Sequence, residues 1–309
     1  MRKIISKVDK YHFFYLFVIF SLFGIFVVLA LLNVTVKKQI GEINIIESPI
    51  SFVPSSYPQV VNKAYPDISA QGAIVMDSVS KVPLFEKNAH YTFPPASTTK
   101  IMTALVALDY YKPSDVIVIK QPNVEGSMLG FYQDEKFNFN DLLYAMLLPS
   151  SNEAAVAIAQ NYPGGEAAFV EKMNKKAEQM GLVNTHFADP VGIEDQADYT
   201  SPFDLAILSS QALLNPTFSK IVDTKDIPIQ DLDGKKYDFS NLNILLSIPG
   251  VNGIKTGHTE GAGDVLVTSR KIAGGDLIFV VMQSQDRFLD TETLVDYLNS
   301  NVNYLTIRP

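Results

Sequence analysis

The chain of 309 residues carries 25 Lys and Arg against 33 Asp and Glu, and it contains no Cys and no Trp. Its length allows one large domain or two modest ones, and without cysteine a disulfide scaffold, a zinc ribbon, an iron–sulfur cluster and a thiol nucleophile are excluded. Residues 1–40 hold six basic residues and one acidic residue, so the remainder has a net charge of −13. Such an acidic body repels phosphate backbones, and we expect no nucleic-acid partner.

The first predicted element is an apolar helix over residues 11–32, which contain no charged side chain. At 1.5 Å per residue this segment reaches about 33 Å, enough to cross the hydrocarbon core of a bilayer. A cleaved signal peptide is the alternative, but its apolar region is normally about 7–15 residues long and ends in a small-x-small site, which this sequence lacks. We therefore expect an uncleaved, single-pass signal anchor in the cell membrane. Four basic residues precede it, which predicts a cytoplasmic segment 1–10 and an extracytoplasmic remainder.

After the span, residues 33–67 are expected to form an extracytoplasmic linker. This segment is polar, and three prolines and several serines between residues 33 and 60 are typical of an extended spacer. From about residue 68 the pattern becomes globular, which predicts one folded domain over residues 68–309.

The globular part begins and ends with strands, and helices lie between them. Strands are predicted at residues 72–77, 82–86, 116–120, 253–256, 264–270 and 277–283. Helices are predicted at residues 101–111, 141–148, 153–162, 166–180, 202–213 and 291–302. This order predicts an α/β fold whose mainly antiparallel sheet is flanked by helices and interrupted by an inserted helical subdomain.

Several common catalytic sites are missing from the sequence. It contains no Gly-x-Ser-x-Gly, no Walker loop and no His-Glu-x-x-His. The four histidines, at positions 12, 90, 186 and 258, have no metal-ligand spacing, so metal-assisted hydrolysis is not expected.

The first candidate motif is Ser-Thr-Thr-Lys at residues 97–100, directly before an apolar helix. A serine hydroxyl needs an adjacent base to become a nucleophile. On a helix, residues i and i+3 share a face, so the Lys100 amine can reach Ser97 and act as that base if burial keeps it neutral. The helix start also directs free N–H groups toward developing negative charge. A second Ser-x-x-Lys, at residues 78–81, is interpreted as a hairpin turn because no helical pattern follows it.

The second motif is Ser150-Ser151-Asn152, between two predicted helices. Ser and Asn are common helix caps, which is the structural alternative. The functional interpretation makes Ser150 a proton relay and Asn152 an amide that holds a substrate carbonyl.

The third motif is Lys255-Thr256-Gly257, which is either a plain strand-end turn or an edge strand that pairs with an extended substrate. In the second case Lys255 supplies charge, Thr256 supplies a hydroxyl, and Gly257 lets the backbone approach closely.

Together, and in this order, the three motifs resemble the set found in penicillin-binding proteins and class A β-lactamases. Residues 93–104, 141–155 and 243–259 resemble the corresponding segments of D-alanyl-D-alanine carboxypeptidases of the low-molecular-mass penicillin-binding type. The resemblance covers residues 68–300. It implies a β-lactamase/DD-peptidase-like fold, with a DD-peptidase catalytic domain over residues 68–309.

The resemblance further implies a serine-type D-Ala-D-Ala carboxypeptidase that trims peptidoglycan stem peptides, needs no cofactor and is inhibited by penicillins. Ser97 would form the acyl-enzyme, Lys100 would act as the base, and Ser150 would pass the proton to the leaving amine. The oxyanion would lie between the backbone N–H groups of Ser97 and His258, and Arg287 would help bind the terminal carboxylate. For Arg287 a plain surface role, and for the His258 side chain a packing role, are the alternatives.

The sequence departs from the family at two places and leaves rival functions open. Glu153 stands where the family has Asp, and Thr-Ser-Pro at residues 200–202 replaces Ser-Thr-Ala; neither change touches a proposed reacting atom. Many relatives carry a C-terminal domain and anchor, so we expect the N-terminal span to tether this chain. The alternative functions are a β-lactamase, a cell-wall binding module and a DD-endopeptidase. Class A β-lactamases carry a Glu-x-x-Leu-Asn segment, which this sequence lacks. Glu166 is expected in the first turn of a helix.

Overall fold

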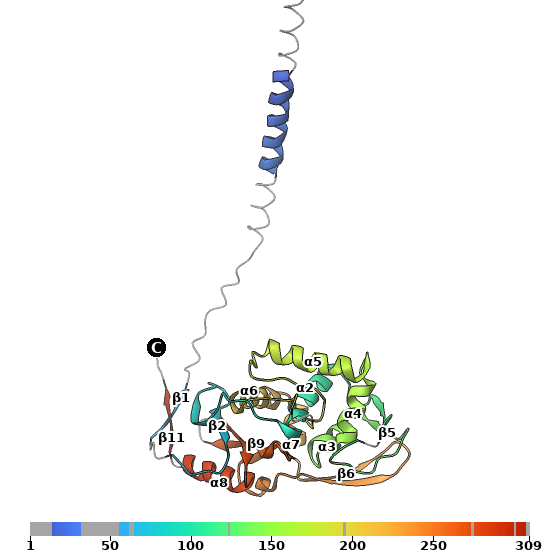
Figure 1. Cartoon of the computed structure of the whole chain (residues 1–309), viewed down its shortest axis with the longest axis vertical. Helices are drawn as coiled ribbons and strands as arrows, with labels where there is room; N and C mark the ends of the chain where they lie inside the picture. The colour runs from blue at the N-terminus through green and yellow to red at the C-terminus, as the bar shows by residue number, and fades with distance from the viewer. Residues whose placement is uncertain are drawn as a thin grey trace, which may run out of the picture. The chain divides into compact units, whose positions relative to one another are not determined.

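The computed structural model describes residues 14–31, 56–61, 65–122, 124–193, 196–272, 275–299 and 301–306. The chain divides into two compact units, Met1–Val53 and Pro54–Pro309, which we describe separately. In the first unit the helix Phe14–Leu31, blue in Figure 1, has a mean hydropathy of 2.8 and is long and apolar enough to cross a membrane. The ends of the predicted span, residues 11–13 and residue 32, lie outside the described residues.

The second unit is built on a five-stranded antiparallel sheet with the strand order β3-β2-β10-β9-β8. The strands are β2 Gly72–Asp77, β3 Pro83–Lys87, β8 Val251–Thr259, β9 Gly263–Ile272 and β10 Gly275–Ser284. A strand was predicted at each of these places, but β8 is longer than expected and runs through the whole Lys-Thr-Gly motif. Because β10 lies between β2 and β9, the late strands complete a sheet that the first two begin.

Both faces of this sheet are buried. Successive side chains of a strand point to opposite faces, and in β10 Leu277 and Phe279 join one hydrophobic cluster whereas Ile278 and Val280 join the other. Helix α8 (Arg287–Leu298) contributes to the first cluster, and the other long helices of this unit contribute to the second.

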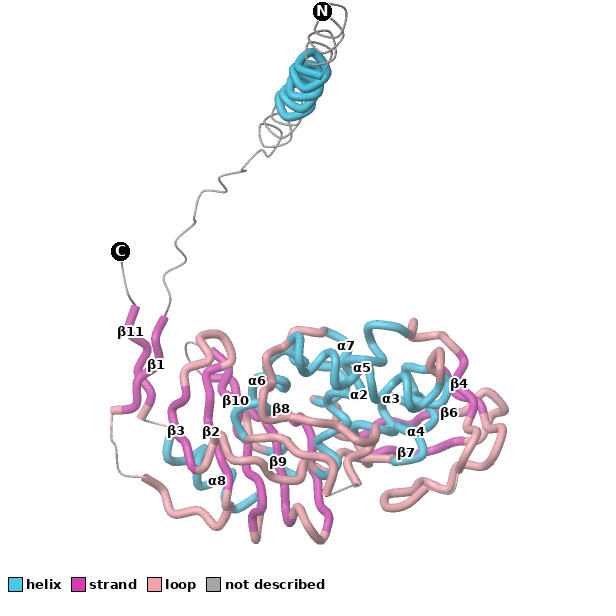
Figure 2. The backbone as a smooth tube through the Cα atoms, turned by 45° about the horizontal axis from the view of Figure 1, so that its top comes forward, coloured by secondary structure: helices cyan, strands magenta, loops and turns pink. Residues whose placement is uncertain are grey.

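The chain between β3 and β8 forms the predicted helical block, most of which lies beside the sheet (Figures 1 and 2). Its helices are α2 Lys100–Tyr110, α3 Phe139–Leu147, α4 Asn152–Asn161, α5 Gly165–Gln179, α6 Pro202–Leu213 and α7 Pro216–Val222. Two short 3₁₀ helices, η1 Ala96–Thr99 and η2 Ile244–Ser247, precede α2 and β8. Every residue of α2 from Lys100 to Ala107 is buried. The apolar run of this helix therefore carries its polar first residue into the core.

Three two-stranded sheets complete the described fold: β1–β11, β4–β5 and β6–β7. Their strands are β1 Ser56–Val60, β4 Val116–Val118, β5 Lys136–Asn138, β6 Asp226–Gln230, β7 Lys236–Ser240 and β11 Val302–Thr306. Of these, only β4 was predicted, and it is shorter than expected. Strand β1 lies within the expected linker 33–67, but it pairs with β11, so this part of the segment belongs to the folded unit.

The last helix differs from its prediction at residues 291–302. It begins at Arg287 because the side chain of Asp286 caps it, accepting hydrogen bonds from the backbone N–H groups of Phe288 and Leu289. It ends at Leu298, and the chain then forms β11. The earlier start places Arg287 in the first turn, from which its side chain reaches the carbonyl of Gly257 in β8.

Candidate active site

Ser97 lies in η1, in a backbone turn that the surrounding elements hold in a strained form. Ala96 has φ 47°, in the left-handed region that a residue with a Cβ atom seldom adopts. Two glycines allow the neighbouring backbone to approach it closely. A Cβ atom on Gly192 would collide with the carbonyl oxygen of Ala96, and one on Gly257 of β8 would lie 3.1 Å from the backbone nitrogen of Ser97. The turn presents Ser97 half-buried beside β8.

Lys100 is fully buried one helical turn after Ser97. Its Nζ lies 2.8 Å from Ser97 Oγ, 2.7 Å from Asn152 Oδ1 and 3.2 Å from the carbonyl oxygen of Val191. Burial lowers the pKa of the amine from 10.5 to about 7, although the carboxylate of Asp189 acts in the opposite direction. At neutral pH a substantial fraction of Lys100 is therefore uncharged.

The protonation state of Lys100 decides whether its amine donates or accepts in its three contacts. An ammonium group donates to all three oxygens. A neutral amine has two N–H groups and one lone pair, so Asn152 and the carbonyl of Val191 can take both N–H groups and leave the lone pair facing the hydroxyl of Ser97. The neutral form is thus arranged to accept the Ser97 proton.

In the second motif Ser151 has a structural role, whereas Ser150 and Asn152 are candidate functional residues. Ser151 is the helix cap of α4, because its Oγ accepts the backbone N–H of Ala154 at 3.1 Å. Ser150, with φ 67°, is buried, and its Oγ has no hydrogen-bond partner among the described residues. Asn152 accepts from Lys100 and donates from Nδ2 to the carbonyl of Glu125 at 2.5 Å. Capping by Ser151 leaves both neighbours available for other contacts.

The Lys-Thr-Gly motif lies in β8, an edge strand whose one neighbour in the sheet is β9. Lys255 is buried and donates to the carbonyl of Thr256 at 2.9 Å. Burial lowers its pKa well below 10.5, and the charges of Lys100 and Arg287 lower it further. Lys255, Thr256 and Gly257 therefore extend along an edge strand beside η1, and the strand-end-turn alternative is wrong.

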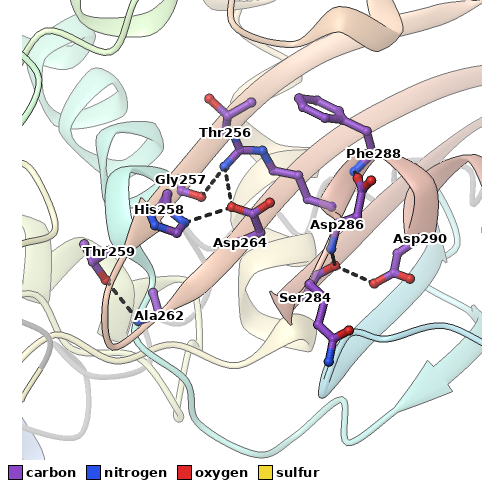
Figure 3. Close-up of polar contacts among 12 residues, drawn as sticks. Thr256, Gly257, His258, Thr259, Ala262, Asp264, Ser284, Asp286, Phe288 and Asp290 are labelled. Atoms are coloured by element: carbon purple, nitrogen blue, oxygen red, sulfur yellow. Dashed lines mark hydrogen bonds and ion pairs between the residues drawn. The ribbon is translucent and has the colours of Figure 1, made fainter.

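The side chains of His258 and Arg287 contact one carboxylate, that of Asp264, which no motif marks; Figure 3 shows His258 beside it. Oδ1 of Asp264 lies 2.8 Å from Nδ1 of His258 and 3.2 Å from Nη1 of Arg287. The same Nη1 donates to the carbonyl oxygen of Gly257 at 2.8 Å. Arg287 is therefore tied to the strand that carries the third motif, rather than being a plain surface residue.

Two further acidic residues shape the site without belonging to a motif. Asp189 accepts the backbone N–H groups of Val191 and Gly192, which shapes the loop whose carbonyl faces Lys100. Glu153, buried in α4, accepts the N–H groups of Leu129 and Phe131 at 2.6 and 3.1 Å. The sequence shows that Glu153 departs from the family pattern, and Asp189 shortly before Gly192 is a turn signal. Neither observation shows which backbone N–H groups each carboxylate binds.

The described residues include no cluster of three or more His, Asp or Glu side chains that could hold a metal ion. Glu166, which matters for the β-lactamase alternative, lies in the first turn of α5 as predicted.

The chain is similar to several known proteins. The family profile described as D-alanyl-D-alanine carboxypeptidase matches residues 59–286. The D-alanyl-D-alanine carboxypeptidase DacF of Bacillus subtilis is 31% identical over 242 residues, which are 75% of this chain and 62% of that protein. The D-alanyl-D-alanine endopeptidase of Escherichia coli is 28% identical over 253 residues, 75% of this chain and 79% of that protein. A Streptomyces DD-transpeptidase structure is 32% identical, with a TM-score of 0.71 over 75% of this chain and 97% of that one. The expected fold is confirmed.

Proposed function

Because the chain belongs to the D-alanyl-D-alanine carboxypeptidase family, we propose that it is a serine-type carboxypeptidase that removes the terminal D-Ala from peptidoglycan stem peptides. Penicillins would acylate the same serine. The observation that carries the proposal is the 2.8 Å contact between Ser97 Oγ and the buried Nζ of Lys100. The hydroxyl therefore has a base beside it, and because the pKa of that amine is about 7, part of it is uncharged at neutral pH and able to accept a proton.

In the proposed acylation step, Ser97 Oγ attacks the carbonyl carbon of the penultimate D-Ala and passes its proton to Nζ of Lys100. The N–H groups of Ser97 and His258 stabilise the resulting oxyanion. Asn152 holds the substrate amide, while Lys255, Thr256 and Gly257 bind the substrate along β8. Lys255 also supplies positive charge to the terminal carboxylate, because an anion nearby favours its protonated form.

Collapse of the tetrahedral intermediate breaks the C–N bond. The proton that Lys100 accepted passes through the Ser150 hydroxyl to the leaving amine, so that Lys100 becomes neutral again and the terminal D-Ala departs. Water then attacks the ester on Ser97, and Lys100 accepts the water's proton and returns it to Ser97 Oγ. The buried hydroxyl of Ser150, with no other partner among the described residues, supports this relay role.

The second Ser-x-x-Lys provides a matched control for the test. Ser97→Ala should abolish D-Ala release from a stem pentapeptide and covalent labelling by fluorescent penicillin, whereas Ser78→Ala should preserve both. Mass spectrometry of the penicillin-treated chain should place the adduct on Ser97. Labelling that survives in Ser97→Ala would refute the proposal. Rapid nitrocefin turnover would favour the β-lactamase alternative, and labelling without D-Ala release from any stem peptide would favour the binding module.

DD-endopeptidase activity on cross-linked peptides is a second candidate, supported by the similarity to the Escherichia coli endopeptidase. Both reactions cleave after a D-Ala residue and would use the same serine. Comparing kcat/KM on a pentapeptide with that on a cross-linked dimer distinguishes them. A ratio in favour of the dimer would replace the carboxypeptidase assignment.

We also propose that the apolar N-terminal helix anchors the enzyme in the cell membrane, with residues 1–10 in the cytoplasm and the catalytic domain outside. The length and hydropathy of Phe14–Leu31 support a membrane anchor or a signal sequence. Sequencing the N-terminus of the membrane-bound protein decides between them. An intact residue 1 supports the anchor, and a terminus after residue 31 supports cleavage.

A further inference from the structure

Asp264 occupies a position that no motif marks, at the second residue of β9. It pairs directly with His258 in the register of the two strands, and its Oδ1 contacts both His258 and Arg287. The three residues come from β8, β9 and the first turn of α8. The Asp264 and Arg287 side chains are 26% and 18% exposed, whereas that of His258 is 64% exposed. The Asp264 carboxylate is therefore largely shielded from water where it faces Arg287, so it can hold the Arg287 side chain in one place.

Nη1 of Arg287, which contacts Asp264, also reaches β8, the strand beside Ser97. Nη1 of Arg287 donates to the carbonyl oxygen of Gly257, and Gly257 is the residue that lies against the backbone nitrogen of Ser97. The carbonyl of Gly257 and the N–H of His258 belong to one peptide unit. In a trans peptide these two groups point in opposite directions, and the described residues contain no cis peptide. A donor that fixes the carbonyl on one side therefore fixes the N–H on the other.

We propose that Asp264 is a positioning residue for catalysis. By holding Arg287 against the carbonyl of Gly257, it fixes the direction of the His258 N–H that receives the oxyanion. The inference rests on the proposed function, and it gives Arg287 a task at the β8 backbone in addition to any contact with substrate. It also explains why the His258 side chain is tied to the same carboxylate, since both ends of the peptide unit are then anchored.

A competing role for Asp264 makes the opposite prediction about substrate affinity. If Arg287 acts mainly by binding the terminal carboxylate, Asp264 competes with that carboxylate for the guanidinium, and its removal lowers KM. If Asp264 positions the oxyanion donor, its removal lowers kcat and the acylation rate and leaves KM unchanged, because oxyanion contacts strengthen in the transition state.

The test uses the full chain in detergent and three variants. Asp264→Ala removes the contact, Asp264→Asn keeps the shape without the charge, and Asp296→Asn changes the same charge at an exposed position of α8. Loss of a whole oxyanion donor costs about 100- to 1000-fold, so a loosened donor should cost about tenfold. We expect penicillin acylation and kcat to fall about tenfold in Asp264→Ala and about threefold in Asp264→Asn, with KM within twofold. Asp296→Asn should match the parent.

A double variant checks that Asp264 acts through Arg287. Adding Asp264→Ala to Arg287→Ala should cause no further loss of acylation, because the shared contact is already gone. An unchanged acylation rate in both Asp264 variants, or a lower KM, overturns the proposal and leaves the proposed function intact. If Asp264→Ala does not fold, as judged by circular dichroism, Asp264→Asn carries the test. A parent chain that penicillin does not acylate at all overturns the proposed function together with this inference.

Discussion

The chain contains two Ser-x-x-Lys segments, and they differ in almost everything except their spacing. At residues 97–100 the serine lies in a 3₁₀ turn that continues into a buried helix, and Nζ of Lys100 reaches Ser97 Oγ. At residues 78–81 the same residue types form the turn between β2 and β3, and Lys81 has φ 60°. There Nζ of Lys81 donates to the backbone carbonyl of Ser78, not to its hydroxyl.

The two lysines also differ in how they are surrounded. Burial lowers the pKa of both, and a nearby carboxylate opposes the shift in each, Asp77 for Lys81 and Asp189 for Lys100, but Lys81 is only half-buried. Lys100 is completely buried, and its pKa falls to about 7. The comparison shows that a three-residue spacing becomes a candidate nucleophile–base pair only where a helix brings the two side chains together and the core removes water from the amine.

Replacing the two lysines is the strongest way to break this comparison. Lys100→Met should lower the rate of penicillin acylation at least about 1000-fold, because the serine then lacks its proposed base. Lys81→Met should leave the rate within twofold. Stopped-flow or gel-based acylation of the two variants checks this expectation. Comparable losses in both variants would mean that the segment at 97–100 has no special role.

The pH dependence of acylation sharpens the comparison. As the proposed base, Lys100 would have to be uncharged to accept the serine proton, and its pKa is about 7. The rate should therefore level off above pH 7 and fall about tenfold per unit below it, or about 100-fold by pH 5. Lys81→Met should show the same profile. Asp189→Asn should move the midpoint to lower pH, since the Asp189 carboxylate favours the charged amine. A rate that stays constant from pH 7 to pH 5 would contradict Lys100 as the base.

A third difference is that the segment at 97–100 receives support from a distant loop. Glu153 holds Leu129 and Phe131, and the same loop supplies the carbonyl of Glu125 that orients Asn152 toward Lys100. Glu153→Gln leaves one oxygen for two N–H donors, so we expect acylation to fall about three- to tenfold and the loop to become more sensitive to protease. Glu171→Gln, at an exposed position of α5, is the matched control. Equal acylation rates and equal protease sensitivity in the two variants would show that Glu153 does not support the site.

The smallest expected effect concerns the segment at 78–81 and should appear in stability alone. Ser210 of α6 is buried and accepts a hydrogen bond from Nζ of Lys81 at 2.5 Å. Ser210→Ala should lower the free energy of unfolding by about 1–2 kcal/mol without changing acylation. Ser209→Ala is the control, because the buried Ser209 hydroxyl has no hydrogen-bond partner among the described residues. Urea unfolding measures both. A change in acylation for Ser210→Ala would show that this second segment is linked to the active site.

Much of the fold was predictable because it depends on local patterns. The apolar run after Lys100 predicted a buried helix, and alternating or continuous apolar runs predicted all five strands of the main sheet. The pairing of β1 with β11 was not predictable, because two short strands of mixed composition more than 240 residues apart show no signal in either segment. The start of α8 was missed for a different reason: the capping role of Asp286 could have been recognised, but the apolar pattern begins later.

By itself the sequence determined the candidate reacting groups, their order along the chain and the apolar segment that can cross a membrane, since these follow from residue types and helical spacing. Tertiary structure decided which Ser-x-x-Lys segment has a buried amine, which serine of the second motif serves as a cap, and which carboxylate holds Arg287. Desolvation and hydrogen bonds between distant segments arise only when those segments meet. The contact of Lys100 with Asn152 joins residues 52 positions apart, and no local pattern encodes it.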